Sequence, residues 1–333
     1  MFTFKAEKNK NPLFYIDGKP VYTTFNKNDA DRIPPYRDSS KYLNSDEFRE
    51  RYTLSKREQN ELVKALRSNI VPDNNLKGKF FHIRRDLNQR LFTEIDLRGT
   101  DHKIDWRFPM NPKEWPETQI IIGSSGVGKT HKIVSEITEA LKRSKKRKFI
   151  YVSPELQVDS TLKKLINTKR WSNFFEGIDV SDEAYQEWKT ENGGGDPDGW
   201  WTDVIFPVLD NLEKGVFVVL DDAPDSVVHR HLQKWLIKYL RTGRHKQVGV
   251  GSLQHLVRGR KWTSQSFSSV KWVVLFPRGG GKGKQVEWLY ENLGVGRKRA
   301  RALVDIFGSG GRWMMIHQWS PSVIFGPTYA VWV

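Results

Sequence analysis

The feature that most constrains this chain is a glycine-rich octapeptide, Gly123-Ser-Ser-Gly-Val-Gly-Lys-Thr130. A short apolar run, 118–122, precedes it, and apolar residues at helical spacing follow it from His131 to Lys142. A predicted strand, a glycine turn and a predicted helix in this order are the context in which GxxxxGKT folds as a phosphate-binding P-loop. Its glycines let consecutive backbone N–H groups point at phosphates, at the favourable amino terminus of the helix.

The P-loop predicts ATP and Mg²⁺ as cofactors. Lys129 is expected to reach the β and γ phosphates, and the hydroxyl of Thr130 to ligand Mg²⁺. The alternative is an incidental glycine turn. The residues expected to bind the nucleotide are Gly123, Ser124, Ser125, Gly126, Val127, Gly128, Lys129 and Thr130.

Two acidic residues, Asp221 and Asp222, directly follow the apolar run 216–220. A strand buried on both faces that ends in acids presents them at the carboxyl edge of a parallel sheet, beside the P-loop. We expect Asp221 to hold Mg²⁺ and Asp222 to orient or deprotonate the attacking water. The alternative role for both is capping of a helix after the strand.

Further catalytic candidates lie near the next predicted strand. Gln254 ends that strand, where its amide could sense the γ-phosphate or position water; an ordinary strand-end amide is the alternative. Arg241 and Arg244 occupy a predicted basic turn between a helix at 227–240 and the same strand. Either arginine could reach a neighbouring subunit as an arginine finger. Otherwise they are solvated or face DNA.

Strands that alternate with helices predict an α/β fold, here a three-layer sandwich around a mostly parallel sheet. We expect an ATPase domain at 116–333, with a basic carboxyl-terminal extension from about 285. A smaller amino-terminal α+β lobe of unassigned role is expected at 1–115. The remaining expectations are a helix at 45–66, half-buried strands within 79–108, a strand at 148–152, a helical or loop insertion at 159–190, a flexible segment at 193–199, a helix at 204–212, a strand at 272–276, and one or two strands at 312–325 that extend the sheet.

Composition narrows the partners. Lys and Arg total 55 against 39 Asp and Glu, and a formal charge of +16 favours a polyanion, most often nucleic acid. The absence of cysteine excludes disulfides and thiolate metal sites. No run approaches the ~18 consecutive apolar residues of a membrane-spanning helix, so we expect a soluble, intracellular protein.

Basic residues gather in three patches of the last third, with glycine interspersed, a composition that suits contact with DNA phosphates irrespective of sequence. The alternative for each is solvated surface charge. The candidate DNA-binding residues are Arg258, Arg260, Lys261, Arg278, Lys282, Lys284, Arg297, Lys298 and Arg299.

The ordered segments around the acids, the arginines and Gln254, with Phe149–Pro154 and Val273–Phe276, resemble the poxvirus-type genome-packaging ATPases of the FtsK/HerA superfamily. Such ATPases occur in large DNA viruses and their virophage-like relatives, and the resemblance covers about 118–280. It implies an ATP-driven, ring-forming homo-oligomer that pumps double-stranded DNA into a capsid, with a capsid vertex or portal-type partner and a location in the virion or the host-cell interior.

Other functions remain open. A replicative or conjugative helicase would use the same motor residues. A P-loop kinase would need a second substrate pocket and a lid, and a nucleotide-binding scaffold would not need the acids.

Overall fold

The structure is a computed structural model that describes residues 2–3, 12–23, 43–68, 72, 74–80, 83, 95–109, 117–143, 147–255, 269–278, 281–318 and 322–333. Its centre is a ten-stranded sheet of order β4-β14-β13-β12-β11-β6-β10-β9-β7-β8. From β11 to β8 the sheet is parallel, and from β12 to β4 it is antiparallel. The strands are β4 (Ile95–Asp96), β6 (Thr118–Ile122), β7 (Phe149–Ser153), β8 (Phe175–Asp179), β9 (Phe217–Asp221), β10 (Gly249–Gln254), β11 (Trp272–Leu275), β12 (Met314–His317), β13 (Val323–Phe325) and β14 (Tyr329–Trp332).

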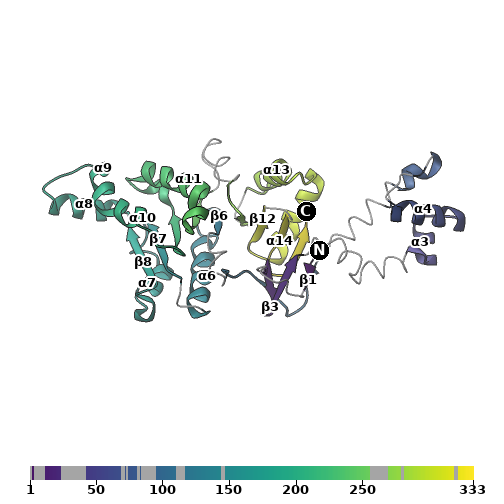
Figure 1. Cartoon of the computed structure of the whole chain (residues 1–333), viewed down its shortest axis with the longest axis horizontal. Helices are drawn as coiled ribbons and strands as arrows, with labels where there is room; N and C mark the ends of the chain where they lie inside the picture. Colours follow the sequence, from purple (N-terminus) through teal and green to yellow (C-terminus); the bar gives the residue numbers. More distant parts are fainter. Residues whose placement is uncertain are drawn as a thin grey trace.

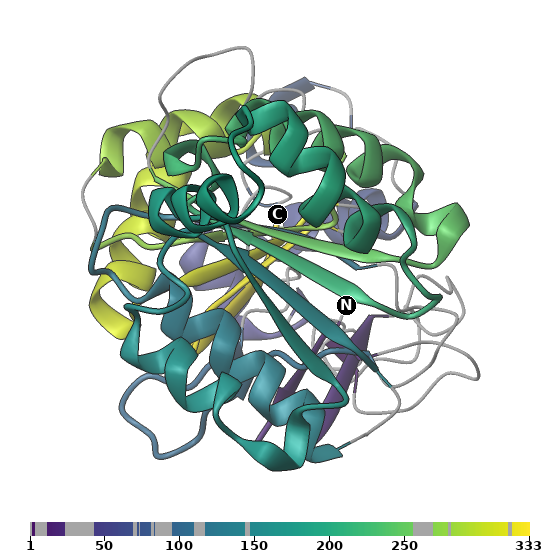
Figure 2. The same cartoon turned by 90° about the vertical axis from the view of Figure 1, so that its left-hand side faces the viewer.

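Apolar side chains on both faces of the strands make this sheet the middle of a sandwich. In β6, Ile120 and Ile122 enter one core and Ile121 enters the other, because successive strand residues point to opposite faces. Figure 2 shows the sheet with helices on either side. One face is covered by α6 (Lys129–Arg143) and α7 (Ser160–Ile166), the other by α8 (Asp182–Glu191), α9 (Pro197–Trp200), η4 (Trp201–Ile205), α10 (Phe206–Asp210), α11 (His229–Lys246), α13 (Lys282–Leu293) and α14 (Arg297–Gly310). The predicted α/β sandwich with a mostly parallel sheet is confirmed.

A second, antiparallel sheet has the order β1-β3-β2-β5. It packs against the main sheet: the rings of Phe14 and Phe325 lie 4.9 Å apart, and those of Trp106 and Trp272 lie 5.7 Å apart. These amino-terminal strands thus share a core with the carboxyl-terminal ones. The predicted boundary near residue 115 lies outside the described residues. The strands are β1 (Phe2–Thr3), β2 (Phe14–Ile16), β3 (Lys19–Thr23) and β5 (Ile104–Asp105).

A small helical cluster completes the described amino-terminal part, at the right of Figure 1. The single helix predicted at 45–66 is wrong: α3 (Asp46–Arg51) and α4 (Lys56–Ser68) are separated at Thr53, whose φ of 49° is left-handed. Phe48 and Leu62 nevertheless share one core, as the predicted apolar face required. A strand was also predicted around Phe80, but 77–80 are helical after η1 (Asn74–Leu76).

Most elements around the P-loop match their predictions within a few residues, and the tail strands do extend the sheet, with β14 as a third. Two predictions differ. The insertion predicted as helical or loop contains an edge strand, β8, and the segment predicted as flexible ends in α9, whose first turn is capped by Asp196. No helix in the described ranges is both long enough and apolar enough to cross a membrane.

Candidate nucleotide-binding and hydrolysis site

The P-loop joins β6 to α6, as predicted. Its backbone conformation requires glycine at particular positions. Gly126 and Gly128 have φ of 73° and 103°, which side-chain-bearing residues rarely adopt. At Gly123 an added Cβ would lie 2.6 Å from Cγ2 of Val127. Lys129 folds over the loop, and its Nζ donates to the carbonyl of Ser124 at 3.3 Å. The ammonium thus lies beside the loop that would hold the phosphates.

Asp221 and Thr130, the two residues predicted to hold Mg²⁺, are in direct contact. The hydroxyl of Thr130 donates to Oδ2 of Asp221 at 3.1 Å, and the buried hydroxyl of Tyr151 donates to the same oxygen at 2.5 Å. Among the described residues, the other oxygen, Oδ1, is buried without a hydrogen-bond partner. A buried carboxylate oxygen and a hydroxyl are ligands that Mg²⁺ accepts. The residues present therefore fit a Mg²⁺ ion, which would satisfy Oδ1.

Burial makes this carboxylate expensive to ionise. Asp221 is 4% exposed, and desolvation raises its pKa to about 6, although the hydrogen bonds from Tyr151 and Thr130 act in the opposite direction. Burial and the neighbouring carboxylate raise the pKa of Tyr151, so its hydroxyl remains a neutral donor. Tyr151 was missed as a site residue, because its contact with Asp221 joins two strands whose pairing the sequence does not show.

Gln254 stands between the P-loop and the acids. Its strand β10 lies between β6 and β9, so that Gln254 pairs with Ile122 and Leu253 pairs with Asp221. Its carbonyl accepts from the N–H of Gly123 at 3.1 Å, and its buried amide donates to Ser252 at 3.1 Å. The placement is the one predicted for a residue that senses the γ-phosphate, while the role itself stays a prediction.

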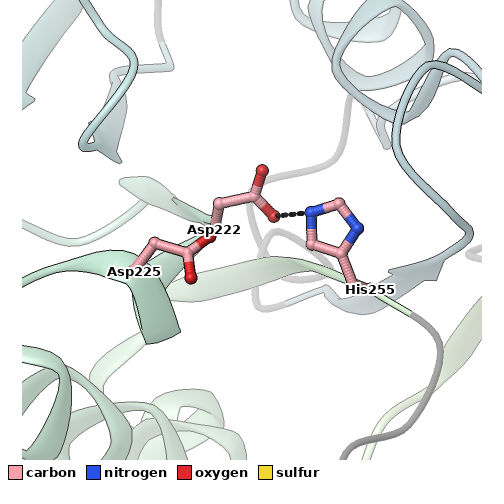
Figure 3. Close-up of side chains that lie close together, drawn as sticks. All are labelled: Asp222, Asp225 and His255. Atoms are coloured by element: carbon pink, nitrogen blue, oxygen red, sulfur yellow. Dashed lines mark ion pairs between the residues drawn. The ribbon is translucent and has the colours of Figure 1, made fainter.

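Asp222 lies next to a residue that sequence reasoning missed, His255. The backbone of Asp222 is left-handed, with φ of 46°. Nε2 of His255 lies 3.0 Å from its Oδ1, and Asp225 completes the group shown in Figure 3. One ligand atom from each of the three lies within 4.8 Å of the others, so they too could hold a cation. The only signal in the sequence was that His255 directly follows Gln254.

A cavity of about 490 Å³ opens beside the P-loop, along the side of α6. Its floor contains the buried ion pair of Lys132 and Glu136, and Nζ of Lys132 lies 4.2 Å from the ring centroid of Trp313. The size is typical of small-molecule sites. The lining residues are Asp105, Trp106, Arg107, Val127, Gly128, His131, Lys132, Ser135, Glu136, Glu139, Phe276, Arg312, Trp313 and Pro327.

The arginine-finger candidates do not lie in a turn. Arg241 and Arg244 are exposed residues in the last turns of α11, which continues to Lys246. Because β10 begins at Gly249 and ends at Gln254 beside the P-loop, the end of α11 lies at the opposite edge of the sheet from the site. The prediction of a basic turn is wrong, and neither arginine is placed to act on the site of its own chain.

The candidate DNA-binding residues that the structure describes belong to different elements. Lys282 and Lys284 belong to the first turn of α13 and not to the predicted glycine loop, while Arg297–Arg299 begin α14. Ion pairs of Lys282 with Asp305 and of Arg297 with Glu287 join the two helices.

Other candidates of this set have different surroundings. The guanidinium of Arg278 donates to the carbonyls of Gly308 and Ser309. Lys284 and Lys298 are exposed, and Arg299 is half-buried. Arg258, Arg260 and Lys261 lie outside the described residues.

Comparison with known proteins gave no match to a family model and no match among curated proteins. Among solved structures, the chain is similar to the genome packaging NTPase B204 of Sulfolobus turreted icosahedral virus 2 in complex with AMP, at 13% identity and a TM-score of 0.42 over 66% of this chain and 98% of that one. It is similar to the cytoplasmic domain of the Thermomonospora curvata type VII secretion ATPase EccC (12% identity, TM-score 0.41, 72% of this chain and 29% of that one). A third similar structure is the pCW3 conjugation coupling protein TcpA with ATPγS (12% identity, TM-score 0.36, 71% and 65%). These scores are low, and the site described above stands on the geometry of this chain.

Proposed function

We propose that the chain is a Mg²⁺-dependent ATPase whose hydrolysis drives the translocation of double-stranded DNA. One observation carries the hydrolytic part: Asp221 has one oxygen held by Thr130 and Tyr151, while its other oxygen is buried without a donor among the described residues. An ionised carboxylate with a raised pKa, next to the P-loop, is costly to keep unless a cation offsets it.

Each residue then has a chemical task. The P-loop N–H groups and Lys129 bind the phosphates, and Thr130 and Asp221 would hold Mg²⁺. When bound, the ion offsets charge on the transferred phosphoryl group. Asp222 accepts a proton from the attacking water or orients it, and Gln254 positions that water. The oxygen of this water forms a bond to the γ-phosphorus while the bond from that phosphorus to the β–γ bridging oxygen breaks, so that ADP and phosphate leave.

The nucleoside part of ATP fits the cavity beside the P-loop. Val127 and Gly128 belong both to the loop and to the cavity wall, so a phosphate chain on the loop continues into this space. Its wall contains the aromatic ring of Trp313, and the exposed His131 begins the same side of α6. We assign base and ribose to this cavity.

Coupling to DNA is supported by the chain's +16 charge and by the family resemblance of 118–280. We propose a ring of identical subunits in which Arg241 or Arg244 reaches the site of the next subunit, since both are exposed and lie at the opposite edge of the sheet from the site of their own chain. Packaging into a capsid, through a vertex or portal-type partner, follows from the resemblance. A helicase is the second candidate, and strand displacement without a capsid would favour it.

Replacement of the P-loop lysine tests the hydrolytic assignment. Lys129→Ala removes the cation beside the phosphates, so we expect ATP turnover to fall at least 100-fold while the circular dichroism spectrum is unchanged. The measurement is phosphate release with Mg²⁺ present. Lys142→Ala, an exposed lysine on the same helix, is the matched control and should keep full turnover. Near-normal turnover by Lys129→Ala would remove this residue from the site.

A further inference from the structure

The contact between Asp222 and His255 joins the ends of two strands. Asp222 directly follows β9, and His255 directly follows β10. Nε2 of His255 lies 3.0 Å from Oδ1 of Asp222. A dashed line marks this contact in Figure 3. The side chain of His255 is 45% exposed and that of Asp222 only 15%. The histidine therefore lies at the solvent side of a mostly buried carboxylate.

The surroundings of Asp222 give this contact its importance. Among the described residues, Oδ1 of Asp222 is buried and accepts no hydrogen bond, so its polar contact is the one with Nε2 of His255. The backbone of Asp222 is left-handed, a conformation that costs energy for a residue other than glycine. It is held by the hydrogen bond from the N–H of Asp225 to the carbonyl of Asp222, at 2.9 Å.

The carboxylates of Asp221 and Asp222 have different partners. Asp221 continues the strand and meets Thr130 and Tyr151, whereas Asp222 meets His255. Each of the two neighbouring carboxylates thus has its own partners. A side chain with two rotatable bonds would otherwise sample several rotamers.

We propose that His255 is the positioning residue of Asp222. It holds Oδ1, so that the second oxygen, Oδ2, is presented to the water that attacks the γ-phosphate. The inference rests on the proposed hydrolytic role of Asp222. In this role His255 acts only through the carboxylate of Asp222. Because His255 follows Gln254, the same strand end would place both the water-positioning amide and the partner of the base.

The first test compares turnover with nucleotide affinity. His255→Ala frees the carboxylate, and partners of this kind typically contribute 10–100-fold to activity. We expect kcat for ATP to fall within that range, while KM and the Kd for a fluorescent ATP analogue change less than twofold. His255→Gln, whose amide nitrogen can reach the position of Nε2, should restore a large part of kcat. The matched control is His102→Ala, which removes the exposed His102–Asp17 pair of the small sheet and should leave kcat unchanged.

The second test is a double-mutant cycle, because a positioning residue has no effect once its target is gone. We expect Asp222→Asn to lower kcat by at least 100-fold, measured over long incubations with radiolabelled ATP. The double variant should then be no slower than Asp222→Asn alone. Multiplicative losses would overturn the inference, as would a normal kcat in His255→Ala.

The same variants separate this inference from the proposed function. Normal hydrolysis by Asp222→Asn would reject Asp222 as the base, and the inference with it. Loss of hydrolysis in Asp222→Asn together with normal hydrolysis in His255→Ala would reject only the positioning role. A kcat of His255→Ala that millimolar Mn²⁺ or Zn²⁺ restores would also overturn it, because the three residues would then act as cation ligands.

Discussion

At the scale of single residues, the site combines residues of one local motif with residues that are distant in the sequence. Lys129 and Thr130 occupy the places that their motif predicts, since a P-loop is a local structure whose backbone depends on glycines at fixed positions. Tyr151 and His255 come from distant parts of the chain and meet the acids only after the strands pair. No local sequence pattern indicates such contacts. The sequence therefore predicted Asp221 and Asp222 without predicting their partners.

The ionised form of Asp221 that would bind Mg²⁺ is expected to lower the stability of the metal-free fold, because this carboxylate is buried. Its folded pKa of about 6 lies above the 3.8 expected for an unfolded carboxyl. Protonation therefore stabilises the fold, a contribution that is complete below pH 3.8 and is lost as the pH rises through 6. At pH 8 the buried charge costs at most about 3 kcal/mol.

Asp221→Asn keeps the size of the side chain and cannot ionise. For the nucleotide-free and metal-free protein, we expect its Tm to exceed that of the wild type at pH 8, and the difference to shrink as the pH falls from about 6 to 4. Thermal melts at several pH values measure this, with Asp225→Asn, an exposed acid, as control. A Tm difference that is constant across the range would contradict the buried charge. The same variant should lose Mg²⁺-dependent hydrolysis.

At the scale of elements, continuous apolar runs predicted the central strands, whereas the edge strand β8 was not predicted. β9 is buried throughout and was predicted from its apolar run. β8 is an edge strand that pairs only with β7 among the described strands, and its Glu176 and Gly177 are exposed. These two residues interrupt the run of apolar residues by which a strand is predicted, so β8 was missed. α11 was predicted to end early, since Gly243 suggested a turn.

Close packing, and not a turn, explains the glycine at position 243. An added Cβ there would lie 2.8 Å from the carbonyl oxygen of Val248, so glycine allows the helix to approach the chain that enters β10. The helix ends at Gln247, whose φ of 57° is left-handed without being glycine. This end shows why the position of Arg241 and Arg244 could not be predicted from turn residues alone.

The cavity between α6 and the segment before β12 gives a prediction about the nucleoside. Trp313→Ala removes an aromatic wall, and contact of a base with an aromatic ring contributes about 1–3 kcal/mol. We expect the Kd for ATP to rise roughly tenfold, with no change in the Kd for inorganic tripolyphosphate, which lacks base and ribose. Trp313→Phe, which keeps a ring, should bind ATP nearly normally. Equal weakening for both ligands would place the base elsewhere.

At the scale of the whole molecule, one sheet brings the P-loop, Asp221, Asp222 and Gln254 together at its carboxyl edge, as open parallel sheets do. The antiparallel strands β12–β14 widen that sheet and join it to β4 and the small sheet, so residues from both ends of the chain form one core. The sequence predicted the sandwich, because alternating strands and helices allow few arrangements. It did not predict how the amino-terminal segments attach, which depends on contacts such as Phe14 with Phe325.

The measurement that tests the central claim most directly is steady-state ATP hydrolysis by the purified chain with Mg²⁺, with and without linear duplex DNA, at two salt concentrations. We expect hydrolysis that needs Mg²⁺ and is stimulated by DNA, and we expect the stimulation to decline at the higher salt because phosphate contacts release counterions. Hydrolysis without stimulation would keep the nucleotide site and reject the coupling to DNA. No hydrolysis under any of these conditions would contradict the account.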